Sequence, residues 1–87
     1  MEKKEGGIEA LRGTLVEIFG EENVVVINTT KYGFEWRYEI TIYWFMFTDE
    51  HLQRIEETIR RTGLRLVGWE IEHSGADNTL ILTLFVA

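Results

Sequence analysis

The chain has 87 residues, a formal net charge of −6 at pH 7 and no cysteine. This length allows one small domain, and a sequence with 45% hydrophobic and 13% aromatic residues is not disordered. Without cysteine there are no disulfides, thiolate nucleophiles or zinc–thiolate sites, and the acidic balance argues against a dedicated nucleic-acid-binding protein.

The N-terminal segment 1–7 is charged and glycine-rich, so we expect a flexible tail before a single domain at 8–87. It lacks the apolar stretch of a signal peptide, and the longest apolar run, 42–47, is too short to cross a bilayer. These features predict a cytoplasmic protein without membrane contact. Thirteen glutamates against two aspartates, a single glutamine and no cysteine also favour a thermostable, heat-adapted protein.

Residues 8–19 have the apolar spacing of an amphipathic helix that ends at Gly20. Gly13 lies away from the apolar stripe, where glycine costs about 1 kcal/mol relative to alanine. Either this glycine is a tolerated defect, or another backbone approaches the helix closely at that point. The stripe that should face the core consists of Ile8, Leu11, Leu15, Ile18 and Phe19.

A hairpin is expected next, because four β-branched residues at 24–27 are followed by turn residues at 30–33 and a long aromatic strand. The second strand should run from Trp36 to Phe47, with its last six residues apolar on both faces. A tight turn would place Val24 near Ile40. The aromatic end of the second strand would then need another strand as a neighbour.

A second helix is predicted from Thr48, which is a suitable N-cap, to the residue before Gly63. Two further strands follow at 64–73 and 79–87. In the first of these, Gly68 marks a bulge or a bend.

The order helix, strand, strand, helix, strand, strand predicts an α+β, two-layer αββαββ sandwich. If each hairpin contributes its second strand to the centre, the antiparallel sheet has the order 1-2-4-3 and both helices cover one face. This topology is similar to a circularly permuted ferredoxin-like βαββαβ fold, in which the first strand has moved to the end. The resemblance concerns topology alone, and the chain carries no family signature.

The alternation of side chains assigns the two faces of this sheet. The residues expected under the helices are Ile40, Ile42, Trp44, Leu80, Leu82 and Leu84. The opposite face should carry an apolar patch that a monomer would rarely expose. This predicted interface consists of Tyr43, Phe45, Phe47, Ile81 and Phe85.

Several uses of the patch are open: a homo-oligomeric contact, a different protein partner, RNA, or coverage within one chain. Aromatics at alternate positions can stack on bases, but Glu39, Glu70 and Glu72 on the same face oppose phosphate binding. His51 and His73 lie in different elements and form no evident catalytic or metal-binding set.

The sequence therefore predicts a small homo-oligomer, with a dimer as the expected form, that acts as a protein-interaction or structural module. The expected partner is a second copy of the chain, a different protein partner stays an alternative, and nucleic acid is not expected. No catalytic, cofactor-binding or metal-binding residue is identified, and no cofactor is implied. The alternative is a small-molecule-binding or catalytic module whose site lies at the oligomer interface.

Overall fold

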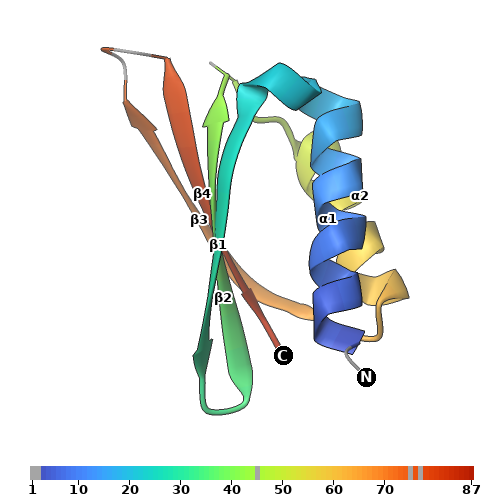
Figure 1. The fold of residues 1–87 in the computed structure, drawn as a ribbon. Coiled ribbons are helices and arrows are strands. Elements are labelled where there is room, and N and C mark those ends of the chain that lie inside the picture. The colour runs from blue at the N-terminus through green and yellow to red at the C-terminus, as the bar shows by residue number, and fades with distance from the viewer. Residues whose placement is uncertain (1–2, 45, 75, 77) are drawn as a thin grey trace.

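Two helices lie on one face of an antiparallel sheet in the computed structural model, which describes residues 3–44, 46–74, 76 and 78–87 (Figure 1). The sheet that these residues form has four strands in the order β1-β2-β4-β3. The α+β class and this strand order agree with the sequence pattern. The elements are α1 (Lys3–Phe19), the short 3-10 helix η1 (Glu21–Asn23), β1 (Val24–Tyr32), β2 (Glu35–Tyr43), α2 (Asp49–Arg61), β3 (Leu66–Ser74) and β4 (Thr79–Val86).

Helix α1 begins at Lys3, five residues earlier than the apolar periodicity predicts. The helix therefore includes residues 3–7 of the segment that was expected to form a tail. Lysine and glutamate are good helix formers, and the first turn of a helix can form without burying an apolar side chain. Hydrophobic spacing consequently marks the buried part of this helix and not its start. The helix ends at Gly20, which has a φ of 96°.

Gly13 lies on the exposed side of α1, and a Cβ atom added there would meet no atom within 4 Å. The alternative of a close backbone approach at Gly13 is therefore wrong, and this glycine is a tolerated defect. The helices meet one residue further on, where the hydroxyl oxygens of Thr14 and Thr58 lie 2.6 Å apart. Arg54 of α2 also pairs with Glu17 of α1, so polar contacts help to hold the helices together.

The β1–β2 hairpin has a tighter turn than expected, with only Gly33 and Phe34 between the strands. Gly33 adopts a φ of 62°, a left-handed conformation that glycine tolerates. The register is shifted as a result: Val24 pairs with Ile42 and not with Ile40, after a β-bulge between Val24 and Val26. Strand β1 therefore extends along almost the whole of β2.

Strand β2 ends at Tyr43, four residues before the predicted end at Phe47. After this point Trp44 and Phe47 pack against the core. The ring of Trp44 lies edge-on to Phe19 at 5.5 Å, and the ring of Phe47 lies 5.7 Å from that of His51. Burying these aromatics beneath the helices is favourable, so the chain leaves the sheet before α2 begins.

Helix α2 has the ends that its sequence predicts. Thr48 caps the N-terminus: its hydroxyl accepts from the His51 amide, while His51 Nδ1 accepts from the Thr48 amide. At the other end, the amides of Gly63 and Leu64 donate to the carbonyls of Arg60 and Ile59. This pattern is a Schellman motif, which needs the positive φ of Gly63.

The core lies between the helices and the strands β2 and β4. The predicted inward residues of both strands are buried, except for Trp44, which is half-buried. Tyr38 also points inward and is 1% exposed, yet its hydroxyl has no hydrogen-bond partner among the described residues. The buried apolar residues are Leu11, Leu15, Phe19, Val24, Tyr38, Ile40, Ile42, Ile55, Ile59, Leu80, Leu82, Leu84 and Val86.

Replacing Tyr38 with phenylalanine should raise the free energy of unfolding by about 1 kcal/mol, because it removes a buried polar group without a partner. Burial also raises the pKa of Tyr38 above its ordinary value. The folded state therefore favours the neutral phenol, whereas the unfolded chain ionises Tyr38 more readily. The free energy of unfolding of the parent protein should consequently fall as the pH rises above about 10. Urea unfolding of both proteins at pH 8 and at about pH 11 measures the effect. A variant less stable than the parent at pH 8 would contradict it.

Candidate interaction surfaces

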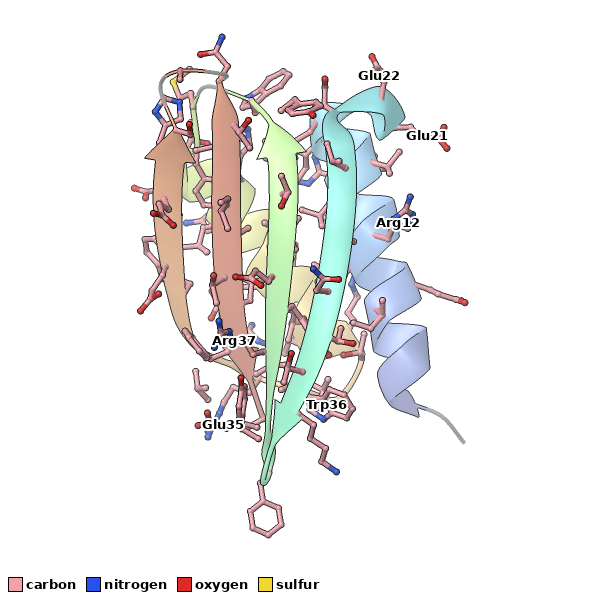
Figure 2. The ribbon with its side chains drawn as sticks, turned by 60° about the vertical axis from the view of Figure 1, so that its left-hand side comes forward. Arg12, Glu21, Glu22, Glu35, Trp36 and Arg37 are labelled. Atoms are coloured by element: carbon pink, nitrogen blue, oxygen red, sulfur yellow. The ribbon has the colours of Figure 1, made fainter. Side chains whose placement is uncertain are left out.

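The face of the sheet opposite the helices is open along all four strands and faces the viewer in Figure 2. Neighbouring residues of β2 point to opposite sides of it, as Trp36 and Arg37 do (Figure 2). In the register of the sheet, Arg37 lies beside Phe85 of β4, and Glu39 lies beside Thr83. We call this surface the outer face.

The predicted interface is only partly assembled on the outer face. Tyr43 is 51% exposed, while Ile81 and Phe85 are half-buried. The prediction for Phe47 is wrong, because its ring packs against the core and against His51. Phe45 lies outside the described residues. The apolar area on this face is therefore smaller than the alternation of the sequence suggests.

The centre of the outer face is a shallow hollow of about 670 Å³. Its floor comes from β4, where Ile81, Thr83 and Phe85 are all half-buried or buried. Charged residues surround this floor on both sides: Arg37 and Glu39 from β2, and Glu70 and Glu72 from β3. The Arg37 guanidinium lies 3.8 Å from the Glu39 carboxylate and also donates to the Tyr32 hydroxyl at 3.5 Å.

Phe85 completes the floor by lying across Gly68 of the neighbouring strand. A Cβ atom at position 68 would come within 3.5 Å of the Phe85 ring. The bulge predicted at this glycine is confirmed, because the register of β3 against β4 shifts between Leu66 and Gly68. The extra residue, Val67, is 43% exposed.

The helix-side face of β3 forms a second surface that the sequence pattern did not reveal. Trp69 and Ile71 pair with Leu84 and Leu82, whose side chains are buried beneath the helices. Trp69 nevertheless remains 47% exposed and Ile71 36% exposed. Figure 1 shows the cause: β3 starts beside the helix layer and diverges from it towards its end. The helices therefore cover β2 and β4 but leave β3 open.

A groove of about 430 Å³ lies where β3 leaves α2. Leu52 and Glu56 of α2 form one wall, and Leu66, Val67 and Trp69 of β3 form the other. Glu56 is paired with Arg60 along the helix at 3.5 Å, so the remaining lining is mainly apolar. The combination of a bulge and an edge strand is the sequence signal that could have suggested incomplete coverage here.

Neither histidine contributes to these surfaces. His51 caps α2 through Nδ1, and its ring lies 5.0 Å from that of Phe19. His73 is exposed near the end of β3. Among the described residues, no three acidic, histidine or cysteine side chains are placed to hold a metal ion. No helix in the described part of the chain has the length and apolar character needed to span a membrane.

The fold and these two surfaces define a small α+β domain with an open sheet face and an open sheet edge. No protein-family model and no curated protein matches the chain.

Proposed function

We propose that this protein is a self-associating interaction module whose outer face binds a second copy of the chain. The observation that carries the proposal is the arrangement of the hollow, in which the apolar residues Ile81 and Phe85 flank Thr83 on the floor inside a charged rim. Protein interfaces commonly have an apolar centre and a polar periphery. A homodimer with a two-fold axis would cover both floors at once.

The charges on the outer face restrict how two copies can face each other. A two-fold axis parallel to the strands, between β2 and β4, would lay each β2 over the β4 of the other copy. Because Arg37 and Phe85 are register partners, each guanidinium would then stack on a phenylalanine ring of the second copy. Each Glu39 would likewise meet the hydroxyl of a Thr83. This arrangement keeps carboxylates from facing one another.

The expected result for the unmodified protein is a dimer at micromolar concentration. Size exclusion coupled to light scattering should give a molar mass of twice the 10.2 kDa of one chain. Sedimentation velocity over a concentration series then measures the dissociation constant. A mass of one chain throughout the micromolar range would overturn the proposal.

We further infer that the fold is a circular permutation of the ferredoxin-like fold. The element order αββαββ and the central position of β2 and β4 support this inference.

The lack of cysteine is compatible with a cytoplasmic protein. The abundance of glutamate and the lack of cysteine favour the thermostable character suggested by composition.

A further inference from the structure

Strand β3 lies at the edge of the sheet, and within the described part of the chain only β4 pairs with it. We propose that this edge binds an extended segment of a partner protein, in which basic and apolar residues alternate, as an added strand. The site lies along the edge of the sheet and shares Glu70 and Glu72 with the rim of the outer-face hollow, but the inference does not depend on self-association.

The two edges of the sheet differ in how they are protected. Edge strands usually carry lysine, proline or bulges that prevent pairing with another chain. The β1 edge has a bulge at Val25, and its exposed residues at 28–31 are polar and include Lys31. The β3 edge has its bulge at the start, and from Gly68 to Ser74 the ladder continues without interruption, lysine or proline. Strand addition is therefore favoured at β3.

The side chains on the helix-side face of β3 determine which residues suit every second position of the partner segment. An added strand would place alternate side chains beside Trp69 and Ile71, which are large, apolar and exposed. At the start of β3, the same face leads into the groove beneath Leu52 of α2. Apolar side chains from a partner would bury this surface without displacing any element of the fold. These positions of the segment should therefore be apolar.

The charged side chains on the outer face of β3 determine which residues suit the remaining positions of the partner segment. Glu70 and Glu72 point to this side and form no ion pair with another described residue. Both are exposed, so a strand added beside them would bring its outward side chains next to two carboxylates. Opposite charges on neighbouring strands are stabilising and like charges are destabilising. Lysine or arginine should therefore occupy these positions.

A labelled nine-residue peptide of alternating lysine and valine, acetylated and amidated at its ends, provides the probe. We expect its fluorescence anisotropy to rise on titration with the protein, and the affinity to fall with salt. A matched peptide with glutamate in place of lysine should bind at least about tenfold more weakly, because its carboxylates face Glu70 and Glu72. Equal binding of the two peptides would overturn the proposal.

Backbone methylation separates strand addition from general charge attraction. The amides of alternate residues in a strand point to opposite edges, so N-methylation of one alternate set should abolish binding and methylation of the other set should spare it. Hydrogen exchange should also slow at β3 amides when the peptide binds, while β1 amides remain unchanged. Equal binding of the two methylated peptides would mean that charge alone holds the peptide. This outcome would refute binding by strand addition.

Protein variants locate the site without disturbing the core. Ile71→Lys introduces a charge at an exposed position on the β3 edge and should weaken binding about tenfold or more. Val25→Lys makes the same kind of change at an exposed position on the β1 edge and should leave binding unchanged. A greater loss with the β1 variant would refute the assignment. So would protection of β3 amides that grows with protein concentration in the absence of peptide, because a second copy would then occupy the edge.

Discussion

Replacing Leu82 with alanine should lower the free energy of unfolding by about 2–5 kcal/mol. Leu82 is 1% exposed and lies on β4 between Ile40 and Ile71, under the helix layer. The substitution removes buried methyl groups and leaves a cavity that the surrounding strands cannot readily fill. A domain of this size is typically stable by only about 4–13 kcal/mol, so the variant should lose a large part of its stability. Urea unfolding monitored by circular dichroism measures the change.

Ile71→Ala provides the matched control for Leu82→Ala. Ile71 is the register partner of Leu82 on β3 and points to the same side of the sheet, but it is 36% exposed. Its truncation should therefore cost clearly less than that of Leu82. Equal losses at the two positions would mean that the helix layer covers β3 as well as β4. A negligible loss at Leu82 would invert the assignment of the two faces.

Replacing Ile81 with glutamate should convert the proposed dimer to a monomer. Ile81 forms part of the apolar floor of the outer-face hollow, where Glu39, Glu70 and Glu72 already supply negative charge. In a dimer the new carboxylate would be buried without a cationic partner, which typically costs about 3–5 kcal/mol. This cost corresponds to a dissociation constant raised by about 100-fold or more. Sedimentation velocity over a concentration series measures it.

Phe34→Glu is the control for this experiment. Phe34 is 96% exposed at the tip of the β1–β2 hairpin, away from the hollow, so it tests the same added charge on an exposed apolar residue. It should leave the dimer intact. Loss of the dimer in both variants would point to net charge or to the hairpin tip instead of the hollow. Ile81→Glu should also retain peptide binding at β3, which keeps the two proposals separable.

The register of the first hairpin shows where sequence reasoning reached its limit. The run of β-branched residues and the turn chemistry near Gly33 were enough to predict two paired strands. They did not determine whether the turn contained two residues or more, and this choice moved the partner of Val24 from Ile40 to Ile42. Turn length depends on how the whole hairpin packs, so local composition constrains it weakly.

Phe47 shows the same limit for the candidate interface. Alternation placed it on the outer face with Tyr43, because a strand was expected to continue through 47. The competing gain in burial came from residues outside the expected strand: the core side chains against which Phe47 packs, and the ring of His51 in the first turn of α2. No pattern within 36–47 contains that information. The apolar patch was consequently overestimated, while the charged rim around Ile81 was already visible in the alternation.

The amino-acid sequence by itself determined the type and order of the elements, the helix caps at Thr48 and Gly63, and the inward side of β2 and β4. These features depend on periodicity and local backbone chemistry, which act over a few residues. Only the tertiary structure decided how far β3 diverges from the helices, and therefore that Trp69 and Ile71 remain open beside α2. Sheet twist and helix placement result from the packing of the whole domain, so the surfaces available to partners emerged only at that level.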